Sequence, residues 1–343
     1  MRSTVATWLI ADDAGSESIF PQVPGRSSSR RFQEVYWRCV IVFFASCQRH
    51  TTLANYILFT NVEPPTIEGL NISSWLEKHS IRIVNLQISH RLPKRRCSSW
   101  GNQFYLLDIV KYAANTESIG TLLLFDSDCF WLGSPDLMIE SVERYGVLTY
   151  ALWYDENQIV NGFSRRTLTE LYERFFGEQA GCTLTYSGGE IFAASGDAIQ
   201  ELAQECAMLW KKNLEAMHRN ESWCQEEAQF LSLLYHRHRY EIGTANQFLK
   251  RIWTAPGFSG FRNTSAGDRD LLVWHLPAEK RFGFRDMFRE VCDERSDFWT
   301  IPVGRGFVDH AASTFGIEQK RWNRRVRDNA VRIKDKLSTK AGI

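Results

Sequence analysis

The chain of 343 residues carries 41 Lys and Arg against 40 Asp and Glu, so its formal net charge is +1. Hydrophobic residues make up 44% and charged residues 24%, which excludes an intrinsically disordered chain. The balanced charge argues against a nucleic-acid partner. The longest uninterrupted apolar run, Cys39–Ala45, is much shorter than the roughly 20 residues that a membrane-spanning helix needs.

Eight cysteines are scattered along the chain without a C-x-x-C pair, and most lie within apolar patterns. A zinc site or a disulfide framework would show closer spacing, so we expect free thiols in a reducing, cytoplasmic compartment. The apolar run near the start is short and ends in two aspartates. It does not match a secretory signal, and we interpret Thr4–Ile10 as a strand.

Apolar strands alternate with amphipathic helices through the first half of the chain. This alternation predicts an α/β fold in which a mostly parallel sheet is covered on both faces. Between the first strand and the first helix, residues 12–30 include nine Gly, Ser or Pro, which predicts a mobile loop. We expect strands at 5–11, 56–61, 81–87 and 121–125, and helices at 32–47, 73–79 and 102–114.

The second half mixes the same elements less regularly. We expect strands at 146–153, 190–194 and 271–275, and helices at 165–176, 198–217 and 226–235. With no internal repeat and no clean linker, the pattern favours one domain over residues 1–315. Residues 316–343 hold nine Lys and Arg against three acids and predict a separate basic amphipathic helix.

The segment LLLFDSDCFWLGSP, residues 122–135, carries the sharpest chemical signal. An apolar strand there delivers Asp126 and Asp128 at its carboxyl end, where open α/β sheets bind ligands. Two carboxylates at this spacing can converge on a hard divalent cation that also binds a diphosphate. The alternative is a polar turn after a strand, but the flanking apolar and aromatic residues favour a nucleotide-sugar site.

Four patches in order resemble glycosyltransferases of the GT-A fold, and in particular family eight, the lipopolysaccharide galactosyltransferase and glycogenin type. They are IADDA at 10–14, DSD at 126–128, TYSGGEIFAAS at 185–195 and VWHLPAEKRF at 273–282. Some positions depart from the family pattern. Ser187 or Gly188 stands at the family's asparagine, and Ala228 stands at a family glutamine.

This resemblance implies a GT-A-like enzyme that transfers a hexosyl group from a nucleotide-sugar, most simply a UDP-sugar, to a saccharide or lipid-linked acceptor. It further implies bacterial surface polysaccharide synthesis, retention of the anomeric configuration, and Mn²⁺ or Mg²⁺ held by Asp126, Asp128 and His275. Asp12 would lie near the base, and Lys280 or Arg281 would stabilise the departing diphosphate. The donor contacts expected in addition are Ala11, Asp13, Arg96, Asn102, Ser127, Gly188 and Gly189.

Three glutamates are the candidates for catalysis. Glu190 follows two glycines that let the backbone approach a ligand, so its carboxylate could hold sugar hydroxyls or act as a general base. Glu226 and Glu227 compete for the same roles. Because acids are also favoured in the first turn of a helix, the sequence leaves open which glutamate faces the sugar.

Two basic segments have both functional and structural interpretations. Residues 91–96 (RLPKRR) could contact the donor diphosphate, although charge runs are usually solvated surface. The tail helix places Trp322, Val326 and Ile333 on one face and is suited to an anionic membrane surface, or to simple packing on the domain.

Two other classes of protein remain open at this point. A sugar nucleotidyltransferase also uses a Rossmann-like half and a divalent cation, but it usually carries a Gly-rich basic loop where this chain has Asp12 and Asp13. A non-catalytic glycan-binding or scaffold protein would keep its role without Asp126 and Asp128, whereas an enzyme would lose its activity.

Overall fold

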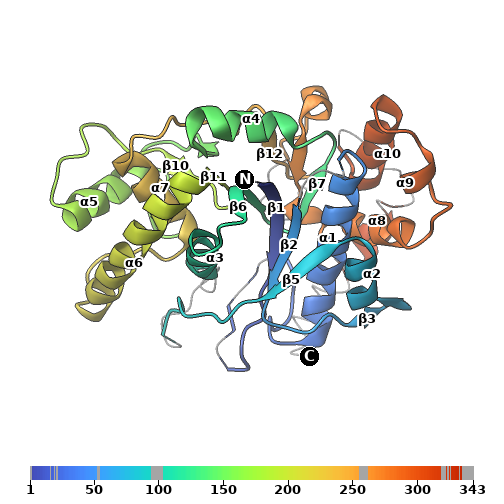
Figure 1. The fold of residues 1–343 in the computed structure, drawn as a ribbon, viewed down its shortest axis with the longest axis horizontal. Coiled ribbons are helices and arrows are strands. Elements are labelled where there is room, and N and C mark those ends of the chain that lie inside the picture. Colours follow the sequence, from blue (N-terminus) through green and yellow to red (C-terminus); the bar gives the residue numbers. More distant parts are fainter. Residues whose placement is uncertain are drawn as a thin grey trace.

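A six-stranded sheet forms the centre of the molecule (Figure 1). Strands β5, β2, β1 and β6 run parallel, whereas β11 is antiparallel to its neighbours β6 and β8. The prediction of a mixed α/β fold with a mostly parallel sheet is therefore confirmed. In sheet order, the strands are β5 (Ile81–Asn85), β2 (Asn55–Thr60), β1 (Arg2–Leu9), β6 (Ile119–Phe125), β11 (Ile191–Ser195) and β8 (Val147–Leu148). The computed structural model describes residues 2–15, 17–18, 20, 22–51, 55–93, 103–254, 262–317, 322, 324, 326–331 and 333.

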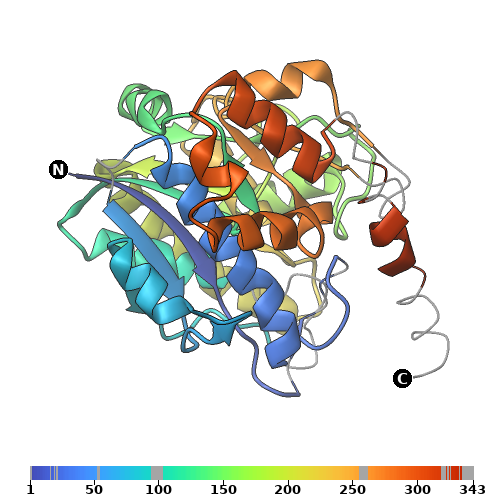
Figure 2. The same ribbon diagram turned by 90° about the vertical axis from the view of Figure 1, so that its right-hand side faces the viewer.

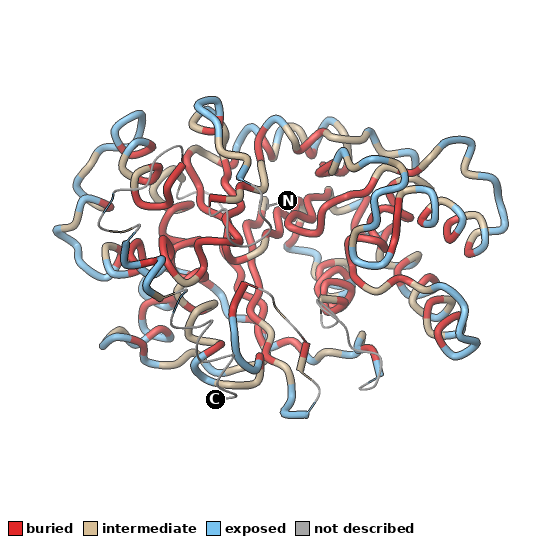
Figure 3. Tube along the Cα trace, turned by 180° about the vertical axis from the view of Figure 1, so that it is seen from behind, coloured by how far each residue is buried: buried red, intermediate tan, exposed pale blue. Residues whose placement is uncertain are grey.

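Both faces of the central sheet are buried, which explains the uninterrupted apolar run of β6. Successive side chains of a strand point to opposite faces. Leu122 and Leu124 accordingly belong to the core on one face, and Leu123 and Phe125 to the core on the other. Figure 3 shows the buried residues gathered along the sheet and the exposed ones on the outer helices and loops.

Helices cover the sheet on both faces. Helix α1 (Arg30–Gln48) begins where the Ser29 side chain accepts a hydrogen bond from Phe32 N, and it packs against β1, β7 and α8. Helices α3 (Tyr105–Ala114) and α6 (Gly196–His218) pack against each other and β6 in the other core. Further α-helices are α2 (Ile72–Lys78), α4 (Asp136–Tyr145), α5 (Arg165–Phe176), α7 (Glu227–Arg237), α8 (Gly283–Val291), α9 (Asp297–Thr300) and α10 (Arg305–Phe315).

A three-stranded sheet lies beside the central one and brings a distant segment to it. Its middle strand, β13 (Val273–His275), pairs parallel with β12 (Leu249–Arg251) and antiparallel with β7 (Cys129–Trp131). Since β7 starts directly after the D-x-D segment, this pairing connects the segment to residues about 150 positions later in the chain. Two short antiparallel pairs lie outside these sheets: β3 (Thr66–Ile67) with β4 (Leu70–Asn71), and β9 (Ala151–Leu152) with β10 (Tyr186–Ser187), which follows α5.

One predicted strand, 146–153, is wrong as a single element. The chain changes partner within it, because β8 pairs with β11 of the central sheet and β9 pairs with β10 outside it. Between them Thr149 pairs with neither sheet. Its backbone N–H donates to Thr244 Oγ1, and its hydroxyl donates to the Glu241 carbonyl. Thr149 is a single polar residue within a largely apolar segment, and threonine is common in strands, so the pattern does not reveal the break.

The described residues between β1 and α1 form no helix or strand. They are nevertheless tied to Asp12, whose Oδ2 accepts hydrogen bonds from Ser18 N at 2.8 Å and Ser27 Oγ at 2.5 Å. Phe20 also packs on the α1 rings of Phe32 and Tyr36. The mobility expected for residues 12–30 stays a prediction.

From Trp322 onward the tail segment is helical at its described positions, and it lies at the edge of the molecule (Figure 2). Arg327 fixes it to α8 through two hydrogen bonds to the Asp286 carboxylate, at 2.9 and 2.8 Å. Trp322, Val326 and Ile333 are 77%, 58% and 59% exposed. Over the described part of the chain, every helix is too short or too polar to cross a membrane.

Candidate metal centre and adjoining cavity

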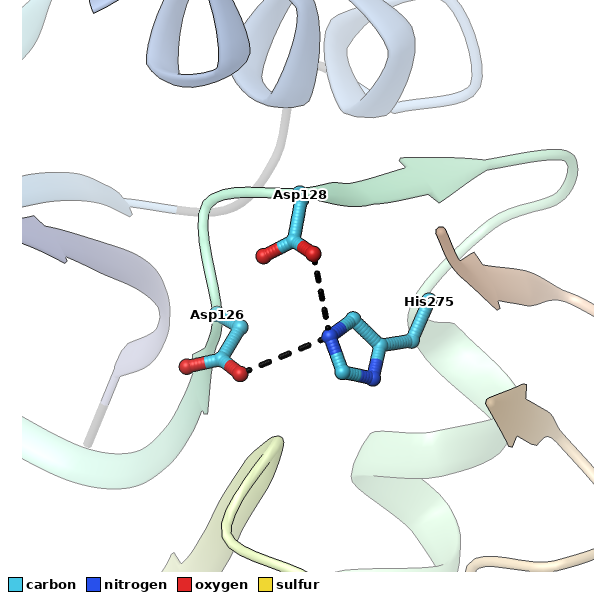
Figure 4. A group of neighbouring side chains, drawn as sticks. All are labelled: Asp126, Asp128 and His275. Carbon is cyan, nitrogen blue, oxygen red and sulfur yellow. Dashed lines mark ion pairs between the residues drawn. The ribbon is translucent and has the colours of Figure 1, made fainter. Parts of the chain in front are cut away.

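Two aspartates and a histidine converge at the carboxyl end of β6 (Figure 4). Asp126 and Asp128 lie in the turn between β6 and β7, and His275 ends β13, in register with Cys129 of β7. His275 Nε2 is 3.5 Å from Asp126 Oδ2 and 3.1 Å from Asp128 Oδ2. One potential ligand atom from each residue lies within 4.8 Å of the others. The structure thus brings together the three residues for which a shared metal was expected.

The chemistry of this group fits a divalent cation. Carboxylate oxygens and a neutral imidazole suit Mn²⁺, and carboxylates suit Mg²⁺. His275 Nε2 is buried and, among the described residues, has no hydrogen-bond partner of acceptable geometry. This nitrogen could therefore serve, together with the two carboxylates, as a ligand of one shared cation.

The two aspartates have opposite electrostatic environments. Burial raises the pKa of Asp126 to about 7, with repulsion from Asp128 acting in the same direction against attraction from His275. Burial would also raise the pKa of Asp128, but Lys280 and His275 outweigh it and hold that pKa well below the ordinary range. Asp128 is therefore the permanent negative charge of the group.

Lys280 is the cation closest to this charge. Its Nζ donates to Asp128 Oδ2 at 2.7 Å, and both side chains are buried. The same Nζ lies 5.6 Å from the centre of the Tyr36 ring. Attraction to Asp128 exceeds the effect of burial and raises the pKa of Lys280, so this side chain stays protonated.

Glu190 lies on the other side of His275. Its Oε1 is 3.2 Å from His275 Nδ1, and Arg251 donates to both of its oxygens, Nε to Oε1 at 2.5 Å and Nη2 to Oε2 at 2.7 Å. Although burial opposes it, Arg251 lowers the pKa of Glu190 to about 2. Burial lowers the pKa of His275, but Asp128 and Glu190 together raise it to about 9.

A cavity of ≈ 260 Å³ opens beside these groups. It lies at the carboxyl ends of β1 and β6 and the start of the antiparallel β11, the edge where α/β sheets bind ligands. Its wall combines the charged groups with aromatic rings. The aromatic residues that line it are Trp8, Phe20, Phe32, Tyr36, Tyr105, Tyr154, Tyr186 and Trp253.

Two further carboxylates, those of Glu226 and Glu227, line this cavity. Glu226 accepts hydrogen bonds from the Tyr186 hydroxyl and from Asn161 Nδ2, the latter at 2.6 Å. The side-chain amide of Gln103 faces Glu227 and, with its nitrogen turned toward the carboxylate, donates to both oxygens at 2.9 and 2.8 Å. Burial raises the pKa of both glutamates, and for Glu227 the neighbouring charge of Glu226 adds to it.

Gly188 and Gly189 are needed because carboxylates press against them. A Cβ on Gly188 would lie 2.2 Å from Glu190 Oε2, and a Cβ on Gly189 would lie 2.0 Å from Glu227 Oε1. Real Cβ atoms essentially never come that close to another atom. The two glycines thus let the carboxylates of Glu190 and Glu227 lie directly against the backbone.

Only some of the other residues predicted to contact the nucleotide-sugar line this cavity. Ser127 lines it, whereas Asp12, Asp13 and Arg281 are not among its lining residues. Asp12 fixes the following loop, and Asp13 forms an ion pair with Arg91. Ala11 exchanges two backbone hydrogen bonds with the Asn61 side chain, at 2.8 and 2.9 Å. Arg96 and Asn102 lie outside the described residues.

Several residues of the site escaped the sequence analysis. Arg251 is one of two cations in the short strand LKR, and nothing in that pattern marks it as a partner of Glu190. The sequence motifs also miss three other residues: Asn161 lies in a loop, Gln103 lies just before α3, and Tyr36 lies on α1. Only their position in three dimensions relates them to the carboxylates.

No protein-family model matches the chain, and none of the curated proteins matches its sequence. Among solved structures, the apo form of mouse xyloside xylosyltransferase 1 resembles this chain with a TM-score of 0.46 and 9% sequence identity, covering 80% of this chain and 97% of that one. A likeness at this level assigns no role to any residue. The resemblance to family eight is therefore carried by the four sequence patches.

Proposed function

We propose that this chain is a metal-dependent glycosyltransferase that moves a sugar from a nucleotide-sugar, most simply a UDP-sugar, to a saccharide or lipid-linked acceptor. The observation that carries the proposal is the group Asp126, Asp128 and His275 at the open edge of the sheet, facing a cavity. Asp126, Asp128 and His275 would hold Mn²⁺ or Mg²⁺. When bound, such a cation neutralises the diphosphate of the donor.

Lys280 would stabilise the negative charge that develops on the departing nucleoside diphosphate. Its ammonium is buried, protonated and already oriented toward the metal group by Asp128. A cation fixed in a water-poor site costs little reorganisation during the reaction, which is the general reason for such electrostatic stabilisation. Arg281 is less suited to this role, because it does not line the cavity.

Glu226 and Glu227 would face the sugars. Both carboxylates line the cavity, and among the described residues they accept side-chain hydrogen bonds from neutral groups, namely Tyr186, Asn161 and Gln103. Oxygens of this kind are suited to accept hydrogen bonds from sugar hydroxyls. Glu227, which carries a raised pKa, is our candidate for the group that exchanges a proton with the acceptor hydroxyl. The acceptor and the stereochemical outcome, expected to be retention, belong to this proposal.

Calorimetric titration of the purified protein with UDP, with and without Mn²⁺, tests the proposal. We expect binding that depends on Mn²⁺ and is lost in Asp128→Ala. The control is Asp270→Ala, which removes a carboxylate that is 81% exposed at the end of the 3-10 helix η1 (Ala266–Asp270) and does not line the cavity. Absence of UDP binding in both conditions would refute the UDP-sugar proposal. Release of pyrophosphate from a nucleoside triphosphate and a sugar phosphate would instead identify a nucleotidyltransferase.

We further propose that the tail contacts an anionic membrane surface, in keeping with a lipid-linked acceptor and with cytoplasmic synthesis of bacterial surface polysaccharide. The proposal is supported by three large apolar side chains, those of Trp322, Val326 and Ile333, which are exposed on one face of a basic helix. Flotation with vesicles that contain anionic phosphatidylglycerol checks it. Binding should fall in Trp322→Ser, and equal binding to neutral phosphatidylcholine vesicles would contradict the proposal.

A further inference from the structure

We propose that Glu190 is a positioning residue, which fixes the imidazole of His275 so that Nε2 faces Asp126 and Asp128, and that Arg251 in turn fixes Glu190. The inference rests on the proposed metal site and says how that site is held together. It replaces the expectation that the Glu190 carboxylate meets the sugar or acts as a base.

The first step concerns the two nitrogens of His275. In a neutral imidazole only one of them carries a proton, and the hydrogen bond that a nitrogen makes decides which one it is. Glu190 Oε1 lies 3.2 Å from Nδ1, so it accepts the Nδ1 proton. A carboxylate in this position leaves the Nε2 lone pair for a cation and makes the imidazole a better ligand.

The second step concerns the freedom that remains to the ring. The backbone of His275 is held on both sides by β12 and β7, and its carbonyl accepts a hydrogen bond from Ile252 N at 2.8 Å. Rotation of the side chain is then the main motion left. The contact with Glu190 restricts that rotation from the side opposite the aspartates.

The third step concerns Arg251, which lies beside His275 in the register of β12 and β13. Its guanidinium binds Glu190 in the two-pronged geometry that gives strong and directional pairs. The Arg251 backbone is itself fixed, since its N–H donates to the Tyr150 hydroxyl at 2.9 Å and its carbonyl accepts from Asn263 at 2.8 Å.

Glu190 differs from Glu226 and Glu227 in the partners of its carboxylate oxygens. Oε1 meets both Arg251 and His275, Oε2 meets Arg251, and the side chain is 0% exposed. Among the described residues, no Lys, Arg or His forms an ion pair with Glu226 or Glu227 within 4.0 Å, and we assign these two carboxylates to the sugars. Glu190 lines the same cavity, but Arg251 and His275 take up both of its oxygens, so we assign it to holding the metal ligand and the other two glutamates to the sugars.

Manganese titration followed by electron paramagnetic resonance tests this division without nucleotide or activity. We expect Glu190→Gln to weaken Mn²⁺ binding by about 10–100-fold, the usual effect of losing such a partner of a metal ligand. The histidine-nitrogen coupling in the pulsed spectrum of bound Mn²⁺ should also weaken. The matched control is Glu226→Gln, another buried glutamate of the same cavity, for which affinity and coupling should match the unmodified protein.

The outcomes separate this inference from the proposed function. If the unmodified protein binds no Mn²⁺ with or without UDP, the metal site fails and the inference fails with it. If Glu190→Gln retains both the affinity and the nitrogen coupling, the inference is overturned while the metal site stands. Should Glu190→Gln not fold, as judged by thermal unfolding, Arg251→Lys decides in its place, and unchanged Mn²⁺ affinity there overturns the inference.

Discussion

Lys280 and Asp128 form a buried ion pair, with 2.7 Å between Nζ and Oδ2, although they lie 152 residues apart in the chain. The pair joins the turn after β6 to the 3-10 helix η2 (Pro277–Glu279) that follows β13. It therefore contributes both to the charge of the metal group and to the attachment of the small sheet.

Lys280→Met should destabilise the fold, because it leaves a buried carboxylate without its nearest cation. Removing one partner of a buried pair typically costs about 3–5 kcal/mol, and we expect the lower end, since His275 also faces Asp128. Urea denaturation measures the free energy of unfolding. The double variant Lys280→Met with Asp128→Asn should recover part of the loss, and strictly additive losses would contradict the coupling.

Gly189→Ala should impair the proposed transfer reaction more than the stability. The new Cβ would lie 2.0 Å from Glu227 Oε1 and would force that carboxylate away from the cavity. A displacement of about 1 Å in a catalytic group can cost on the order of 100-fold in rate. Turnover of the donor and urea denaturation together check this. Gly267→Ala is the control, since a Cβ there meets nothing within 4 Å, and an equal loss in both variants would refute the prediction.

Asn61→Ala should weaken the end of the β1–β2 pair. The Asn61 side chain accepts from Ala11 N and donates to Ala11 O, as a further ladder residue would. Loss of two such hydrogen bonds should lower the free energy of unfolding by about 1–3 kcal/mol. Asn61→Asp removes the donor and turns a carboxylate oxygen toward the Ala11 carbonyl, so it should show at least as large a loss in the same denaturation experiment. Stability equal to the unmodified protein in Asn61→Ala would count against this role.

The stability should decrease when the pH falls from about 7 to 4, in part because of His50. Burial lowers the pKa of His50 from 6.5 to about 4. The unfolded chain therefore takes up a proton near pH 6.5 while the folded chain does not, and the contribution of the neutral ring is lost as the pH falls. We expect about 1–3 kcal/mol from this group. Denaturation of His50→Gln over this pH range should show a flatter dependence, and parallel curves would exclude His50 as the cause.

The elements that the sequence predicts well are those with a strong local pattern. Helices at 32–47 and 165–176 correspond to α1 and α5, and the apolar run at 121–125 lies within β6. Such segments are buried on a defined face, so their periodicity reflects their environment. The short strands β7, β12 and β10 have two or three residues each. They exist because of their partners, and a local pattern of that length carries no signal.

The same distinction applies to the site. Asp126 and Asp128 could be found because an apolar strand ends abruptly in acids, and His275 because it follows another apolar run. Arg251 could not, since its role depends on the register between β12 and β13 and on the carboxylate of Glu190. Glu190 itself was predicted to matter, but its partners, which decide its task, are visible only in the folded chain.

The pairing of β7 with β13 also has a consequence for the order in which the protein acquires its parts during synthesis. The turn that carries Asp126 and Asp128 leaves the ribosome about 150 residues before His275 and Lys280, so the acidic turn precedes its cations by at least several seconds at ordinary translation rates. During that interval the nascent chain carries the carboxylates of Asp126 and Asp128 without the partners His275 and Lys280 that face them in the folded protein. Contacts between residues so distant form late because closing the long loop costs entropy. The proposed metal site would therefore be complete only when the last third of the chain has docked.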